Sequence, residues 1–279
     1  MHFLNLSTPK ASLPREEAVI LPVLYGGTDA AAASVSKGAT AILAASQMLS
    51  TFDVETKTDF NELGIRTLSP VPATLSLQET VEQVATLCTP FFRKHTLVAA
   101  IGGNYQITEG LVRAAVLANN GLSVVHLGAH PHLLDPDDQS LDVMGRIKEL
   151  CPVSHLGIRS MRRAEHAKLH EDNLVFARDL YATGLNAAVD ALDVLDETVY
   201  LAIDLDVLDP ACMPAVEWPE PGGLDWYGLN NLIRMVAREK MIIGFDITGL
   251  VVRENELSPQ MLAAKLLYKT LICCIRNNR

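Results

Sequence analysis

The sequence predicts a three-layer α/β/α fold built on a mainly parallel sheet with helices on both faces. Short apolar runs, each suited to one buried strand, alternate along the chain with segments in which apolar residues recur at helical spacing. Parallel strands need crossover helices of this kind, because a tight turn cannot join two strands that run in the same direction. The 279 residues are 49% hydrophobic, which is enough for a large core. Neither a linker, an internal repeat nor a shift of composition divides the chain, so residues 1–279 are expected to form a single domain.

The individual elements follow from the same patterns. Continuous apolar runs predict strands, and apolar residues three and four apart predict helices. The expected strands are 18–24, 96–101, 123–127, 153–157, 199–203 and 241–247, and the expected helices are 76–92, 107–118, 161–182 and 225–238. The segments after the strands, near Gly102, Gly128, Asp204 and Asp246, are expected to meet at the carboxyl edge of the sheet, where open α/β sheets bind ligands.

Composition narrows the classes of partner. The formal net charge is −10 and the isoelectric point is near 5.2, which argues against nucleic acid or an anionic membrane surface and mildly favours small cationic molecules. The longest apolar runs are too short to span a bilayer, and no secretory signal is recognisable. The 5 cysteines are scattered, so the pattern indicates neither a disulfide framework nor a cysteine zinc site. A reducing, cytoplasmic location suits them.

The segment from Tyr200 to Pro210, YLAIDLDVLDP, carries the strongest chemical signal. Its apolar start predicts a buried strand, on which side chains two residues apart share a face, so Asp204 and Asp206 are expected to point the same way. Two carboxylates held together away from water repel each other, and one of them takes a proton unless a cation lies between them. Pro210 ends the strand, which places the pair at its carboxyl end. The pattern predicts half of a metal site.

The chain resembles the ureohydrolases (arginase, agmatinase and relatives), and within them the short agmatinase-like branch. The motifs occur in the family's order over nearly the whole chain, at 102–108, 127–132, 157–160, 204–210, 219–224 and 263–269. The resemblance implies an eight-stranded sheet, a site with two manganese ions that hydrolyses a guanidinium group to urea, and a homo-oligomer of three or six subunits. It also implies six metal ligands, of which Asp204, Asp206 and His130 are present in this sequence.

The other positions of the implied site have changed. Tyr105, preceded by Asn104, stands where the first histidine ligand is expected. Gly128 replaces the aspartate that bridges both ions, and His132 replaces the last aspartate of its motif. Substrate-facing groups differ as well: Gly249 replaces a glutamate that would grip the guanidinium, and Leu141 stands at the place of a histidine in a shortened loop. A dinuclear manganese cluster is therefore not expected, because two-metal hydrolysis needs both ions.

Two interpretations of the remaining polar residues stay open. His130, His132, Asp204 and Asp206 form a set of imidazoles and carboxylates that suits one divalent ion, zinc or manganese. Alternatively, the pocket holds no metal, and His130 neutralises the carboxylates by a hydrogen bond. Restoring the changed residues through Gly128→Asp, Tyr105→His, His132→Asp and Gly249→Glu is expected to recover metal binding before turnover.

Three functions are compatible with this pattern. The first is a non-catalytic binding or regulatory homologue, acting beside an active relative and releasing no urea from arginine or agmatine. The second is a metal-dependent hydrolase with a mononuclear or altered site that acts on a small amidine, guanidine or amide such as agmatine. The third is an agmatinase that works despite the substitutions. Losing several groups that act on one transition state commonly costs orders of magnitude in rate.

Other histidines are given structural interpretations. His166 and His170 are four residues apart on an expected helix, yet they stand among arginine and lysine residues and are predicted to lie on a solvated face. His126 ends an apolar strand and is predicted to be a core histidine with its hydrogen bonds satisfied. Trp218 beside the Pro-Glu-Pro-Gly-Gly segment is expected to line either a pocket or a subunit contact.

Overall fold

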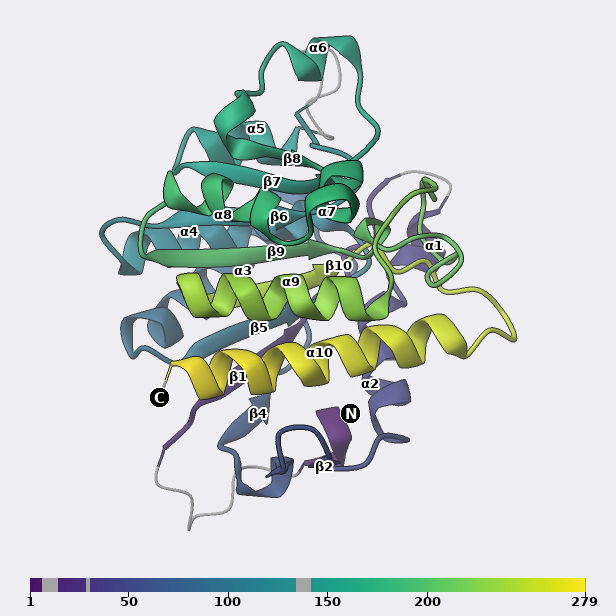
Figure 1. The fold of residues 1–279 in the computed structure, drawn as a ribbon. Helices are drawn as coiled ribbons and strands as arrows, with labels where there is room; N and C mark the ends of the chain where they lie inside the picture. Colours follow the sequence, from purple (N-terminus) through teal and green to yellow (C-terminus); the bar gives the residue numbers. More distant parts are fainter. Residues whose placement is uncertain (7–14, 29–30, 134–141, 279) are drawn as a thin grey trace.

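The computed structural model describes residues 1–6, 15–28, 31–133 and 142–278. An eight-stranded sheet with the order β4-β1-β5-β10-β9-β6-β7-β8 runs through the middle of the molecule (Figure 1), and each pair of neighbouring strands is parallel. The strands are β1 Ala18–Pro22, β4 Ile65–Thr67, β5 Leu97–Ile101, β6 Ser123–Leu127, β7 Val153–Ile158, β8 Leu174–Phe176, β9 Thr198–Asp204 and β10 Met241–Thr248. A separate antiparallel hairpin joins β2 Phe52–Asp53 to β3 Thr58–Asp59. The α/β fold with an eight-stranded sheet is as expected.

Helices bury both faces of the sheet, which gives two apolar cores. One face is covered by α2 Gly38–Ser46, α7 Ala177–Thr183, α8 Asn186–Asp193, α9 Trp226–Glu239 and α10 Ser258–Asn277, and it is the face toward the viewer in Figure 1. The other is covered by α3 Leu77–Arg93, α4 Thr108–Ala118 and α5 Val143–Lys148. The short helices are α1 Ala32–Val35 and α6 Arg163–His166. None of the helices in the described part of the chain combines the length and the apolar character that crossing a bilayer requires.

Local sequence explains where the long helices begin. Ser76 and Glu79 form a reciprocal capping box at the start of α3, and the Asp225 side chain accepts a hydrogen bond from the backbone of Gly228 at the start of α9. The strands are buried along almost their whole length, because helices cover them on both sides, and this accounts for their continuous apolar runs.

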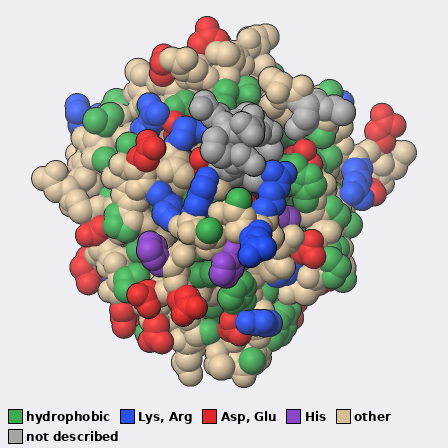
Figure 2. All heavy atoms as spheres, turned by 90° about the horizontal axis from the view of Figure 1, so that it is seen from above, with side chains coloured by type: hydrophobic (Ala, Val, Ile, Leu, Met, Phe, Trp, Pro, Cys, Tyr) green, Lys and Arg blue, Asp and Glu red, His purple; other side chains and the backbone are tan. Residues whose placement is uncertain are grey.

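The long helix expected over 161–182 is wrong. The segment instead contains α6, a 3-10 turn over Glu171–Asn173, the edge strand β8 and α7. His170 therefore lies outside α6, which ends at His166, and the two are not partners on one helix. Both are exposed, which agrees with the predicted solvated surface. Figure 2 shows histidine side chains near Lys and Arg side chains on one face of the molecule. Strands β4 and β8 were missed because three residues are too few to show a period.

The register of three strands brings the candidate site together. Leu127 of β6 pairs with Ile203 of β9, so Gly128 and Asp204 follow at the same level. Asp204 in turn pairs with Thr248 at the end of β10. Residues from three distant segments therefore meet at the carboxyl edge of the sheet, as the alternation of elements predicted.

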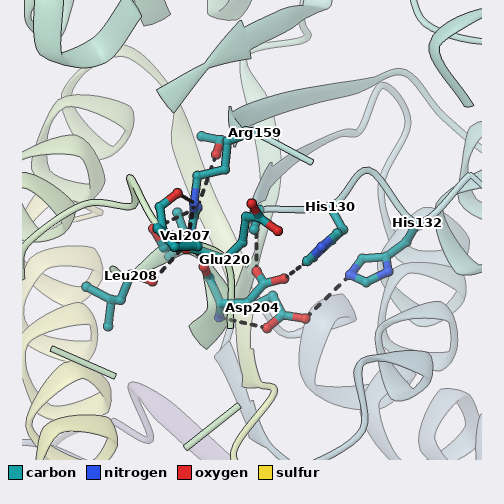
Figure 3. Close-up of polar contacts among 11 residues, drawn as sticks. His130, His132, Arg159, Asp204, Val207, Leu208 and Glu220 are labelled. Atoms are coloured by element: carbon teal, nitrogen blue, oxygen red, sulfur yellow. Dashed lines mark hydrogen bonds and ion pairs between the residues drawn. The ribbon is translucent and has the colours of Figure 1, made fainter. Parts of the chain in front are cut away.

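Arg159 holds the loops that surround this edge. It follows β7, and one of its terminal nitrogens donates to the carbonyl oxygens of Asp206 at 2.6 Å and of Glu220 at 2.7 Å (Figure 3). The same nitrogen also lies 3.2 Å from the carbonyl oxygen of Leu208, and Nε of the guanidinium donates to the carbonyl oxygen of Pro221. One planar group thus ties the turn after β9 to the Pro-Glu-Pro-Gly-Gly loop.

We predict that Arg159→Lys lowers the free energy of unfolding by about 1.5–3 kcal/mol, because a lysine ammonium cannot reach carbonyl groups spread over two loops. Chemical denaturation measures the difference. Arg178→Lys is the matched control, since the Arg178 side chain is 81% exposed. Equal effects of the two substitutions would contradict the role assigned to Arg159.

A buried acid lies beneath the same edge. Asp246 of β10 is fully buried and accepts a hydrogen bond from the Tyr200 hydroxyl at 2.9 Å. Burial raises the pKa of Asp246 to about 7, against the opposing effect of hydrogen bonds from Tyr200 and Thr108, and the negative charge of Asp204 adds to the rise. Between about pH 4 and pH 7 Asp246 is therefore neutral in the folded protein, whereas the same aspartate is ionised in the unfolded chain.

We predict that Asp246 makes the metal-free protein less stable as pH rises from about 4 to 7. In that range Asp246 holds a proton in the folded state that it has lost in the unfolded state. Its contribution to the free energy of unfolding therefore falls by roughly 4 kcal/mol in total. Asp246→Asn cannot titrate and keeps an acceptor for Tyr200. Urea unfolding at several pH values is expected to show that the free energy of unfolding of Asp246→Asn rises relative to that of the wild type as pH rises. The surface variant Asp179→Asn is expected to show the same pH dependence as the wild type.

Candidate functional site

Asp204 and Asp206 lie at the end of β9, but they do not share a strand face as expected. β9 ends at Asp204, and Asp206 lies in the 3-10 turn η6 Leu205–Val207. The Asp204 side chain caps this turn, because its Oδ1 accepts a hydrogen bond from the backbone N–H of Asp206 at 3.0 Å. The turn, rather than strand pleating, brings the second carboxylate into the site. Both carboxylates are buried.

Two groups partner Asp206. Its Oδ1 accepts a hydrogen bond from the backbone N–H of Ala129 at 2.8 Å, and its Oδ2 lies 2.7 Å from Nδ1 of His130. Burial and the charge of Asp204 raise the pKa of Asp206, and His130 opposes this rise. Burial lowers the pKa of His130, but the hydrogen bond and charge of Asp206 outweigh it, so that the His130 pKa is raised overall. Both shifts favour a proton on the His130–Asp206 pair.

His132 reaches the carboxylates through an unusual backbone conformation. Its φ is +50°, in the left-handed region that non-glycine residues seldom occupy. The ring is buried and stacks on Tyr105 with centroids 3.9 Å apart, and its Nε2 lies 3.5 Å from Oδ2 of Asp204 (Figure 3). Backbone strain of this kind persists only where the surroundings hold it, and it concentrates at functional sites.

One ligand atom each of His132, Asp204 and Asp206 lies within 4.8 Å of the others, and we call these three residues the His-Asp-Asp group. His130 is outside this group and contacts it through Asp206. The four residues predicted as metal ligands thus lie close together in the structure. Asp206 belongs to the His-Asp-Asp group and also contacts His130.

The changed positions have definite structural roles. The Asn104 side chain caps a 3-10 turn, η3 Tyr105–Ile107, by accepting from the N–H of Gln106 at 2.9 Å. Tyr105 supports His132 by stacking. Leu141 lies outside the described residues. Gly249 stands where the family resemblance implied a glutamate that binds the guanidinium.

Restoring that glutamate conflicts with the backbone. Gly249 has a φ of +91°, and a Cβ at this position would lie 2.3 Å from Oδ1 of Asp204. A Cβ at Gly128 would likewise lie 2.7 Å from Nε2 of His126. Two of the four restoring substitutions, Gly128→Asp and Gly249→Glu, would therefore require neighbouring atoms to shift, and the expectation that the four together recover metal binding first stays a prediction.

His126 is not the satisfied core histidine that was predicted. Its Nδ1 lies 3.0 Å from Nδ1 of His155, the residue opposite it on β7, while the Nε2 atoms of both rings are buried and lack a partner among the described residues. Sequence analysis missed His155 altogether. The sequence offered one indication of His155: it lies two residues before Gly157, just as His126 lies two residues before Gly128 at the end of another strand.

A small cavity opens over the carboxylates. Its volume is about 20 Å³, and its lining includes Asp204, Asp206, Tyr105, Glu217 and Trp218. This is room for a single ion or water molecule. The Trp218 ring, 43% exposed, forms the outer wall and meets His130 edge-on with centroids 6.1 Å apart.

The donor set fits a divalent ion. Nε2 of His132 is buried and makes no hydrogen bond among the described residues, and the two carboxylates lack a full counter-charge. Imidazole and carboxylate donors suit zinc and also manganese. The ion would supply the positive charge that the paired aspartates need.

Comparison with known proteins places the chain in a family. A sequence model described as the arginase family matches residues 16–273. The chain is 33% identical over 269 residues to the N(1)-aminopropylagmatine ureohydrolase of Synechocystis sp., covering 91% of this chain and 87% of the relative, and 31% identical over 268 residues to that of Thermus thermophilus, covering 92% and 91%. The agmatine ureohydrolase structure of Thermoplasma volcanium superposes with a TM-score of 0.80 at 22% identity, covering 92% of this chain and 89% of that one. The chain belongs to the arginase family.

Proposed function

We propose that this protein is a metal-dependent hydrolase that uses one divalent ion and acts on a small cationic guanidine or amidine. The observation that carries the proposal is the buried His-Asp-Asp group, with His130 on Asp206. Relatives named N(1)-aminopropylagmatine ureohydrolase and agmatinase support a cationic guanidine as the substrate class.

The protein's own residues divide the work as follows. His132, Asp204 and Asp206 would hold the ion, and Nδ1 of His130 would be available as a fourth donor when it carries no proton. When bound, a divalent ion supplies Lewis acidity and lowers the pKa of a water molecule toward neutrality. His130 is the most exposed of these side chains, at 20%, so it can exchange its proton with the cavity.

The residues at the mouth of the cavity, Glu217 and Trp218, would recognise the substrate. The cavity of about 20 Å³ admits an ion or a water molecule, so the carbon chain of a substrate would lie outside it, against Trp218. An indole face attracts a guanidinium or amidinium, and the Glu217 carboxylate at the lining adds an opposite charge. These groups would take over the role of the glutamate that Gly249 does not provide.

A second candidate is a non-catalytic binding homologue. The close approach of Gly249 to Asp204 favours it, because this backbone leaves no space for a bidentate carboxylate partner of a guanidinium. The two candidates differ in turnover, although either can bind metal.

We predict that the protein binds one zinc ion per chain and that binding tightens as pH rises from about 6 to 8. The raised pKa of His130 means that a proton competes for Nδ1 until the pH passes it, and metal binding releases this proton. Calorimetry with zinc measures affinity and stoichiometry. Asp204→Ala is expected to weaken binding at least roughly 100-fold, and His166→Ala on the surface leaves it unchanged. Two manganese ions per chain would refute the mononuclear site.

We also predict turnover of at least one small cationic guanidine or amidine by the metal-loaded protein. A panel that includes agmatine, arginine, N(1)-aminopropylagmatine and acetamidine is assayed for released urea and ammonia. Asp204→Ala is expected to abolish the signal, whereas His170→Ala retains it. Metal-loaded protein that is inactive on the whole panel would favour the non-catalytic homologue.

A further inference from the structure

A second cavity lies between the later turns of α9 and α10, beside the turn of the β2–β3 hairpin. The two helices pack side by side on the face of the sheet toward the viewer in Figure 1. The cavity has a volume of about 350 Å³, within the range of small-molecule sites. Its lining shares no residue with that of the small cavity over Asp204 and Asp206, so it is a separate site.

This cavity is positively charged, although the chain as a whole carries a net charge of −10. Four of its lining side chains are cations: Arg234, Arg238, Lys269 and Arg276. Acidic partners reach them only from the hairpin, among the described residues. Asp53 lies 2.6 Å from Nζ of Lys269, and Glu55 contacts both Lys269 and Arg234. Four cations against two carboxylates leave two positive charges without an acidic partner in the described part of the chain.

The two cations without a carboxylate stand at helix ends. Arg238 lies in the last turn of α9 and Arg276 in the last turn of α10, where the partial negative charge of the helix terminus stabilises a cation. Nη1 of Arg276 also donates to the carbonyl oxygen of Thr56 at 2.8 Å. The helix ends account for the presence of these charges, but they leave most N–H groups of the two guanidinium groups available to a ligand.

The Cys273 thiol lies in the wall of the cavity and responds to its charge. Burial raises the pKa of Cys273, while the positive charges of Arg234 and Arg238 oppose this rise. The two guanidinium groups therefore favour negative charge at a point inside the cavity. An anion bound beside Cys273 would be attracted by the same two groups.

We propose that this cavity binds a small organic phosphate. A phosphate monoester carries about −1.5 to −2 charges near neutral pH and three strong acceptor oxygens, which matches the two positive charges that lack an acidic partner. Arginine N–H groups pair with phosphate oxygens in bidentate geometry. Ile233 and Ile272 give the lining an apolar part, against which the carbon skeleton would lie. The proposal goes beyond the proposed function and does not depend on a metal.

Calorimetric titration with glycerol 3-phosphate tests the site. At low ionic strength, where screening is weak, the wild type is expected to bind one molecule per chain. Arg238→Gln is expected to weaken binding about 10-fold or more, because it removes a charged donor. Arg93→Gln is the matched control, since Arg93 is likewise exposed and lies in the last turn of α3. It is expected to bind as the wild type does.

Alkylation of cysteine locates the ligand in the unaltered protein. Iodoacetamide labelling, followed by mass spectrometry of the peptides, is expected to slow at Cys273 when glycerol 3-phosphate is present. Cys212 is the internal control, because it is also half-buried but does not line the cavity. Its labelling is expected to stay unchanged.

The possible results decide for or against the phosphate site. Wild-type protein that binds no glycerol 3-phosphate at millimolar concentration would overturn the proposal. Equal affinity in Arg238→Gln, or binding without protection of Cys273, would do the same, because the ligand would then lie elsewhere. Succinate, a dicarboxylate, tests the ligand class, and succinate that binds as tightly as glycerol 3-phosphate would refute the assignment to phosphate.

Discussion

Two carboxylates buried side by side govern the carboxyl edge of this sheet. Asp204 and Asp206 are joined by a single turn, and each is shielded from water. Mutual repulsion and burial both favour the protonated form, as the raised pKa of Asp206 shows. The groups in contact with them supply hydrogen-bond donors, and the cavity beside them has room for a cation.

Several groups donate hydrogen bonds to the two buried carboxylates. The N–H of Ala129 and Nδ1 of His130 engage Asp206, and the N–H of Asp206 itself engages Asp204. Arg159 does not pair with either carboxylate, because its N–H groups donate to backbone carbonyl oxygens of the same turn and of the neighbouring loop. It holds the turn and the loop in place, and the negative charge of the two aspartates is left to be balanced from within the cavity. A divalent ion would do this directly.

Close contacts surround the positions at which this sequence differs from the motifs that the family resemblance implied. His132 takes a left-handed conformation and leans on Tyr105, so these two replacements work together. Gly128 makes room for His126, and Gly249 makes room for Asp204.

The sequence by itself determined the layered α/β fold, most of the strands and the location of the site. Strand periodicity and alternation are local properties, and the carboxyl edge follows from parallel connection. It also named His130, His132, Asp204 and Asp206. Only the tertiary structure decided how these side chains meet, since the turn after Asp204 and the left-handed backbone of His132 depend on contacts with distant segments. The pairing of His126 with His155 was hidden for the same reason: strand register brings the two rings together, and no local pattern in the chain records it.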